Sequence, residues 1–203
     1  EVQPDRVTIL AQTAERAGVN VSDLEGSASA APTVTPEDAP AAAAAVFWLG
    51  ELARSDGDWE TALARYRQYL TLQPGLIDSY VQARIAESAA AFGDEEAAIA
   101  AWRAAIVAPR SDAGGDLREA LAMALTREGD RDGALAEYDA IVAGADPGWR
   151  KARALVLAGQ ALATAGDLEG AHARYLQAVT DYPTPPITLE ALRALVDAGV
   201  PVD

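Results

Sequence analysis

The sequence predicts an all-α fold in which helical hairpins follow one another along the chain. First, a Gly-Asp dipeptide recurs at nearly constant intervals, beginning at Gly57, Gly93, Gly129 and Gly166. Second, an alanine stands five residues after each of these glycines, and an aromatic residue stands four residues after each alanine. Third, half of the 203 residues are hydrophobic but only 6% are aromatic, and alanine supplies much of the hydrophobic fraction. Because alanine has the highest helix propensity, the composition and the repeat indicate the same fold class.

The repeated motif has the chemistry of a turn followed by a second helix. Glycine adopts the left-handed conformation that ends a helix, and the aspartate after it caps the next helix. The alanine, the aromatic residue and the residue three positions further on share one face of that helix. Successive alanines are 36, 36 and 37 residues apart, which fixes the length of one unit. The four triplets are Ala62, Tyr66 and Tyr69; Ala98, Trp102 and Ala105; Ala134, Tyr138 and Ile141; and Ala171, Tyr175 and Ala178.

The first helix of each unit has a complementary face in which large and small residues adjoin. This adjacency marks the place where the two helices of a hairpin cross closely. Gln82 and Arg118 interrupt the apolar pattern, so we expect those helix starts to be looser. The four faces are Val46, Leu49, Gly50 and Ala53; Gln82, Ile85, Ala86 and Ala89; Arg118, Leu121, Ala122 and Leu125; and Leu155, Ala158, Gly159 and Leu162.

The sequence predicts three parts. An N-terminal part begins with a helix around Val7–Ala17 and continues into a linker rich in Pro, Ser and Ala. Four hairpins form the middle, and an apolar helix with leucines at helical spacing covers the end of the last hairpin. The predicted boundaries are 1–36 for the first part, 37–75, 76–110, 111–146 and 147–183 for the hairpins, and 184–203 for the capping helix.

This pattern resembles the tetratricopeptide repeat, whose signature is a large residue-x2-Leu-Gly, then Ala-x3-aromatic-x2-Ala, then proline. Pro74, Pro109 and Pro183 match the closing proline, and the third unit has Pro147 a few residues later. The resemblance covers about two thirds of the chain. It implies a right-handed α-α superhelix that binds other proteins.

The alanine-rich repeats and the C-terminal tail are also similar to the helical region that precedes the catalytic module in some bacterial soluble lytic transglycosylases. That resemblance implies a structural arm in the cell envelope, outside the cytoplasm. The Glu-Ser and Gly-Leu-Met-Gln motifs of that family do not occur together, since Glu87-Ser88 is a lone dipeptide, so no catalytic residue is carried over. The chain begins with Glu1 rather than Met, and we expect it to be a piece of a longer protein.

Composition excludes several classes of function. The formal charge is −15, with 31 acidic and 16 basic residues, which disfavours nucleic acid and anionic membranes and favours a basic partner or plain solubility. There is no cysteine and only one histidine, His172, so a thiol nucleophile or a zinc site is not expected. The longest apolar stretch, Ala41–Gly50, is shorter than the roughly 20 residues that span a bilayer. We expect no cofactor and no metal.

The tetratricopeptide resemblance implies that the first helices line a concave groove. We expect apolar anchors at Phe47, Tyr80 and Met123, and glutamates that receive a basic segment; alternatively, Phe47 and Tyr80 only pack against neighbouring helices. The single lysine, Lys151, and the single asparagine, Asn20, lie off the predicted groove, so the carboxylate clamp of chaperone-binding members is absent. The predicted partner-binding residues are Phe47, Glu51, Arg54, Tyr80, Glu87, Glu119, Met123, Arg127, Arg153 and Gln160.

Two functional hypotheses follow, and neither assigns catalysis to these residues. In one, the chain is the helical arm of a lytic transglycosylase, and its partner is the catalytic module of the same protein in the cell envelope. In the other, it is a stand-alone cytoplasmic adaptor that binds a peptide or a basic partner in its groove.

Overall fold

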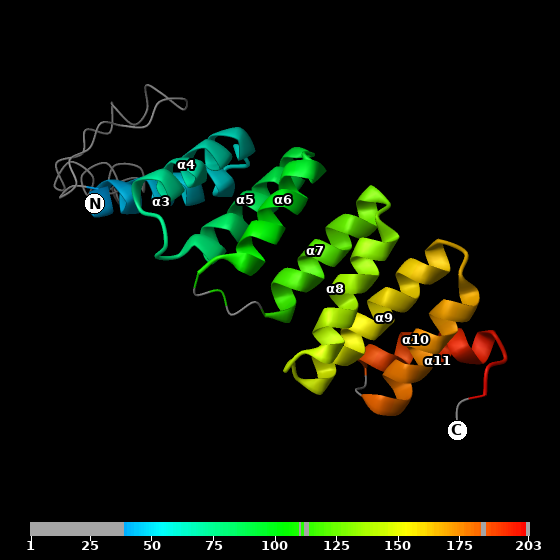
Figure 1. The fold of residues 1–203 in the computed structure, drawn as a ribbon. Helices are drawn as coiled ribbons and strands as arrows, with labels where there is room; N and C mark the ends of the chain where they lie inside the picture. The colour runs from blue at the N-terminus through cyan, green and yellow to red at the C-terminus, as the bar shows by residue number, and fades with distance from the viewer. Residues whose placement is uncertain (1–38, 110, 112–113, 184–185, 202–203) are drawn as a thin grey trace, which may run out of the picture. The chain divides into compact units, whose positions relative to one another are not determined.

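A computed structural model describes residues 39–109, 111, 114–183 and 186–201, and within these ranges every regular element is an α-helix. The helix predicted at Val7–Ala17 and its linker lie outside the described residues. The chain divides into two compact units, of which the first extends to Asp112 and the second begins at Ala113. Two helical hairpins lie in each unit, and a further helix follows the last one (Figure 1). The predicted all-α fold of four hairpins and a capping helix is therefore confirmed.

The first unit contains two hairpins that pack on each other. Helix α3 pairs with α4, α5 pairs with α6, and α5 also packs against α4. The repeated aromatic residues Tyr66 and Trp102 are buried in these hairpins, as the periodicity predicts. The helices are α3 (Ala39–Ser55), α4 (Trp59–Leu72), α5 (Asp78–Phe92) and α6 (Glu95–Val107).

The second unit has the same arrangement with one more helix. Helix α7 pairs with α8, α9 pairs with α10, and α9 packs against α8. The last helix, α11, lies against both α9 and α10, where Ala191 and Leu195 join a core that contains Leu155, Leu162 and Tyr175. The helices are α7 (Gly115–Glu128), α8 (Arg131–Ala143), α9 (Gly148–Thr164), α10 (Leu168–Asp181) and α11 (Ile187–Asp197).

The Gly-Asp dipeptides form the turns inside the hairpins. The glycines have φ angles between 78° and 90°, which only glycine adopts without strain. Each aspartate accepts a hydrogen bond from the backbone N–H three residues later, and this bond caps the second helix. For Asp58, the hydrogen bond from Thr61 lowers the pKa of the carboxyl below its ordinary value. The four caps are Asp58 to Thr61 at 3.1 Å, Asp94 to Ala97 at 3.0 Å, Asp130 to Gly133 at 3.0 Å and Asp167 to Gly170 at 2.9 Å.

Close helix crossing depends on small residues in the first helices. A Cβ atom placed on Gly159 would lie 2.3 Å from Tyr175 Cε1, and one on Gly50 would lie 2.8 Å from Tyr66 Cε1. In each case the tyrosine ring packs closely against the glycine of the partner helix. Arg118 interrupts the apolar pattern of α7, and its Nη1 donates a hydrogen bond of 2.7 Å to Glu137 of α8. A polar contact thus joins the two helices at that position.

Candidate functional site

The ten predicted partner-binding residues form two groups, one in each compact unit. In the first unit they lie on α3 and α5, and in the second unit on α7 and α9. Each group is therefore described within its own compact unit. The first group is Phe47, Glu51, Arg54, Tyr80 and Glu87, and the second is Glu119, Met123, Arg127, Arg153 and Gln160.

The aromatic residues of the first group lie side by side. The ring centroids of Phe47 and Tyr80 are 6.0 Å apart, so the two side chains connect α3 with α5. Phe47 is half-buried and also contacts Tyr66 and Tyr69, with centroid distances of 6.0 and 5.8 Å. Tyr80 keeps 47% of its surface exposed. Phe47 therefore packs mainly against neighbouring helices, whereas Tyr80 presents a large ring to solvent.

The charged residues of the first group are joined by one residue that the sequence did not single out, Arg84. Its Nε lies 3.1 Å from Glu51 Oε1, and its Nη1 donates a hydrogen bond of 2.6 Å to Glu87 Oε2. Arg84 Nη2 also donates a hydrogen bond of 2.5 Å to the hydroxyl of Tyr80, and its Cζ lies 4.7 Å from the centre of that ring. A cation over an aromatic ring is an attractive contact. Arg84 thus holds both glutamates and the exposed ring in place.

Glu51 is the most fully bonded carboxylate of this group. Its Oε1 accepts a hydrogen bond of 2.7 Å from the Tyr66 hydroxyl in addition to the contact with Arg84, and its Oε2 accepts one of 3.2 Å from Arg54 Nη2. Burial first, and the nearby Glu51 second, raise the pKa of Tyr66 above its ordinary value. Tyr66 is therefore a neutral hydrogen-bond donor at physiological pH.

The guanidinium of Arg54 is incompletely bonded. Among the side chains that the structure describes, Arg54 Nε is the one buried nitrogen or oxygen without a hydrogen-bond partner. Burial acts to lower the pKa of Arg54, but the hydrogen bond to Glu51 and the charge of Glu51 outweigh it, so the pKa is raised. Arg54 therefore carries a full positive charge together with an unused donor.

We define the α3–α5 face as the surface formed by Phe47, Glu51, Arg54, Tyr80, Arg84 and Glu87. It contains two guanidinium groups and two carboxylates, so its local charges balance. It also contains one exposed aromatic ring beside a half-buried one. Arg84 could have been found in the sequence, because it stands four residues after Tyr80 and three before Glu87, a spacing that places side chains together on a helix.

Three residues of the second group make polar contacts between neighbouring helices. Arg153 Nε donates a hydrogen bond of 2.8 Å to Glu119 Oε1, which links α9 to α7. Gln160 Nε2 donates one of 3.0 Å to Glu190 of α11. Met123 and Arg127 are exposed on α7. Of the predicted residues in this unit, Glu119 and Arg153 thus bond each other, and Gln160 bonds a residue outside the predicted set.

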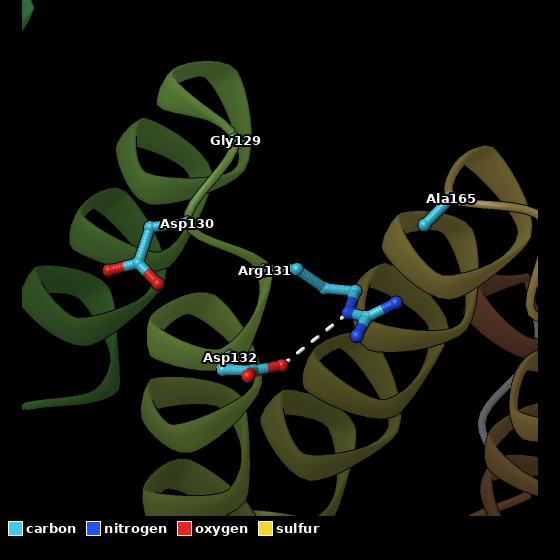
Figure 2. Close-up of a pocket in the computed structure, with 5 residues that line it drawn as sticks. All are labelled: Gly129, Asp130, Arg131, Asp132 and Ala165. Carbon is cyan, nitrogen blue, oxygen red and sulfur yellow. Dashed lines mark hydrogen bonds and ion pairs between the residues drawn. The ribbon is translucent and has the colours of Figure 1, made fainter.

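A shallow depression lies elsewhere in the second unit, beside the turn between α7 and α8 and the end of α9 (Figure 2). Its volume is about 350 Å³. Asp130 in its wall already caps α8, and Arg131 pairs weakly with Asp132 across 3.5 Å. The depression contains none of the predicted residues and no large apolar side chain. Its lining residues are Gly129, Asp130, Arg131, Asp132 and Ala165.

The described ranges contain neither a cluster of metal-ligating side chains nor a membrane-spanning helix. There, no three His, Asp or Glu side chains come together as a metal site. No helix of the described part is both long enough and apolar enough to cross a bilayer. His172 lies on α10, beside the packing residue Ala171.

Known proteins give the fold independently. Residues 44–75, which include most of α3 and all of α4, match the sequence family described as "Tetratricopeptide repeat". Among curated proteins, none matches the sequence significantly. Several solved structures resemble the chain, at sequence identities low enough that the likeness concerns the fold alone.

YrrB, described as "a TPR protein with an unusual peptide-binding site", is 21% identical over 77% of this chain and 79% of its own, with a TM-score of 0.59. MamA is 15% identical over 97% of both chains, with a TM-score of 0.59. BtubC (BKLC) from P. vanneervenii is 15% identical over 93% of this chain and 77% of its own, with a TM-score of 0.57. The chain therefore has the helical-repeat fold of these proteins, and its residues 44–75 match the tetratricopeptide repeat in sequence.

Proposed function

We propose that this chain is a non-catalytic scaffold that binds a segment of another protein on the α3–α5 face. The observation that carries the proposal is the exposed ring of Tyr80, held beside Phe47 by Arg84. Tyrosine and arginine are over-represented among the residues that dominate binding energy at protein interfaces. An aromatic ring whose orientation is fixed before binding loses little conformational entropy when a partner arrives.

The charges of the face favour binding over chemistry. A general acid or base must have a free proton position beside the reacting group. Here the Glu51 carboxylate accepts hydrogen bonds from Tyr66 and Arg54 and forms an ion pair with Arg84, which also pairs with Glu87. We therefore assign positioning roles to these charged residues and no proton transfer.

The proposed partner is a protein or peptide segment. The net charge of −15 opposes nucleic acid as a partner, because phosphate recognition relies on Lys and Arg. The description of YrrB includes a peptide-binding site, which supports a peptide as the ligand of a similar fold. For the proposed adaptor, the expected location is the cytoplasm.

In an alternative form of the proposal, the α3–α5 face binds another part of the same protein. In that reading the chain is the helical arm of a lytic transglycosylase in the cell envelope, and the face holds its catalytic module. This alternative is supported by the resemblance of the sequence to the helical region of soluble lytic transglycosylases. Sequencing the parent gene tests it, since paired Glu-Ser and Gly-Leu-Met-Gln motifs downstream are required and their absence would exclude it.

The direct test is a selection of random 12-residue peptides displayed on phage against the whole chain. Selected peptides are then titrated against wild type, Tyr80→Ala and the control Trp149→Ala. Trp149 is 45% exposed, close to the 47% of Tyr80, but lies on α9 in the other unit. We expect Tyr80→Ala to weaken binding about tenfold or more, as for an interface anchor, and Trp149→Ala to leave it unchanged. Failure to enrich any peptide, or equal binding by Tyr80→Ala, would refute the proposal.

A further inference from the structure

We propose that the segment bound by the α3–α5 face carries a carboxylate, which Arg54 binds, a few residues from an apolar side chain that contacts Tyr80. This inference rests on the proposed function and adds the chemistry of the ligand. It departs from the expectation of a basic partner that the glutamates in the sequence suggest.

The carboxylate of Glu51 has little capacity left for a basic ligand. Tyr66 and Arg84 contact its Oε1, and Arg54 contacts its Oε2. Only 18% of the Glu51 side chain is exposed. Three of the roughly four lone-pair sites of the carboxylate therefore face these donors, which leaves little of it for a lysine or arginine from a partner.

The unused capacity of the face lies on a donor. A guanidinium has five N–H donors, and Arg54 donates a hydrogen bond of 3.2 Å from Nη2 to Glu51 and also interacts with Tyr66. Its Nε is buried without a partner, although buried polar groups are almost always paired. Nε itself is buried, but about a third of the Arg54 side chain, 32%, remains exposed, so a ligand approaches the guanidinium from that exposed side. A carboxylate suits it best, because carboxylate and guanidinium pair through two parallel hydrogen bonds.

The geometry of α3 sets the spacing of the ligand groups. Phe47, Glu51 and Arg54 stand at i, i+4 and i+7, so they share one face of the helix. With a rise of 1.5 Å per residue, Phe47 and Arg54 are about 10 Å apart along the helix axis. An extended peptide advances about 3.3 Å per residue, so its acidic residue lies about three positions from the apolar residue that contacts Phe47 and Tyr80.

Other charges around Arg54 do not cancel this preference. Glu87 is the remaining carboxylate of the face, and Arg84 pairs with it at 2.6 Å. The net charge of −15 repels an acidic ligand at long range. At physiological ionic strength, however, exposed charges are screened over about 8 Å, so the local guanidinium decides the contact. Binding of the acidic ligand should therefore weaken when salt is raised.

The test repeats the phage selection on the whole chain with Arg54→Gln, Arg54→Lys and the control Arg67→Gln. Arg67 lies exposed on α4 of the same hairpin, so the control makes the same change of charge away from the face. We expect wild type to enrich peptides with Asp or Glu about three residues from an aromatic or aliphatic residue. Arg54→Gln should lose the acidic preference, retain the apolar one and bind the wild-type peptides about tenfold more weakly.

The control and the lysine variant separate the effect of charge from that of geometry. Arg67→Gln should bind as wild type, and Arg54→Lys should retain part of the affinity, because lysine keeps the charge but not the planar pair of donors. Circular dichroism melts verify that each variant is folded. Apolar peptides without an acidic residue, peptides with Lys or Arg at that position, or an acidic preference that survives in Arg54→Gln would each overturn this inference while leaving the proposed function intact. No enriched peptide at all would instead refute the proposed function.

Discussion

The hydroxyl of Tyr66 donates a hydrogen bond of 2.7 Å to Glu51 Oε1. Tyr66 is the aromatic residue of the repeat motif on α4, and Glu51 belongs to the α3–α5 face. The buried ring that fills the space beside Gly50 therefore also fixes a carboxylate of the candidate binding face. In this hairpin, one side chain stabilises the fold and orders the face.

Removing that hydroxyl should destabilise the protein. We expect Tyr66→Phe to lower the free energy of unfolding by about 1–2 kcal/mol, because a partly buried carboxylate loses a donor. Tyr175→Phe is the matched control, since Tyr175 has the same place in its hairpin and no hydrogen bond from its hydroxyl among the described contacts; it should change stability by less than about 0.5 kcal/mol. Urea denaturation of the three proteins measures the difference. Equal losses in both variants would contradict the structural role of the bond.

Alkaline pH should weaken the fold through the same residue. Burial, followed by the effect of Glu51, raises the pKa of Tyr66 above its ordinary value of 10.0. The folded state then holds the phenol proton more tightly than the unfolded state, so this stabilisation is complete below about pH 10 and is lost as pH rises above it. Thermal melts at pH 8 and pH 10.5 should show a larger fall in wild type than in Tyr66→Phe. A residual fall is expected, because burial also raises the pKa of Tyr69, Tyr138 and Tyr175.

Local patterns in the sequence predicted the hairpins well. The turn needs a left-handed residue and a cap within two adjacent positions, so Gly93-Asp94 identifies it without knowledge of the rest of the fold. The buried faces follow equally from helical spacing, as with Ala171 and Tyr175 on α10. The predicted helix at Val7–Ala17 and the domain boundaries stay predictions.

The candidate site was less predictable, because its contacts join different helices. Arg84 reaches Glu51 from a position 33 residues later in the chain. The distance between them depends on the register of α5 against α3, which periodicity within each helix does not determine. The sequence therefore suggested Glu51 and Glu87 as free acceptors, whereas Arg84 occupies both. The binding roles of the ten residues stay predictions until a ligand is measured.

Enlarging the glycine at a helix crossing should separate the two helices. A Cβ on Gly159 would lie 2.3 Å from Tyr175 Cε1, far inside van der Waals contact. We expect Gly159→Ala to destabilise the protein by about 1–3 kcal/mol through overpacking, even though alanine favours helix. Gly148→Ala is the control at the start of the same helix, where the nearest atom is at 3.6 Å, and it should be neutral or stabilising by up to about 1 kcal/mol. Chemical denaturation would disprove the crossing argument if both variants gained stability.

Removing a helix cap should have a smaller effect. Asp94 accepts a hydrogen bond of 3.0 Å from the N–H of Ala97 at the start of α6. We expect Asp94→Ala to lower stability by about 1 kcal/mol, and Asp94→Asn to retain most of it, because asparagine caps a helix nearly as well. Urea denaturation distinguishes the two variants. A loss of equal size in both would indicate that the charge, rather than the hydrogen bond, stabilises this helix end.

The availability of Glu119 to a partner can be tested by a double-mutant cycle with Arg153. Two nitrogens of Arg153 lie 2.8 Å from one oxygen of Glu119, whose side chain is mostly buried. We expect a coupling free energy of about 0.5–1 kcal/mol from alanine substitutions at both positions. The pair Arg131 and Asp132 is the control, because its side chains are 49% and 90% exposed and 3.5 Å apart. Its coupling should be close to zero. If Arg153 and Glu119 also show no coupling, Arg153 does not hold the Glu119 carboxylate. Glu119 would then again be a candidate to receive a basic segment in the second unit.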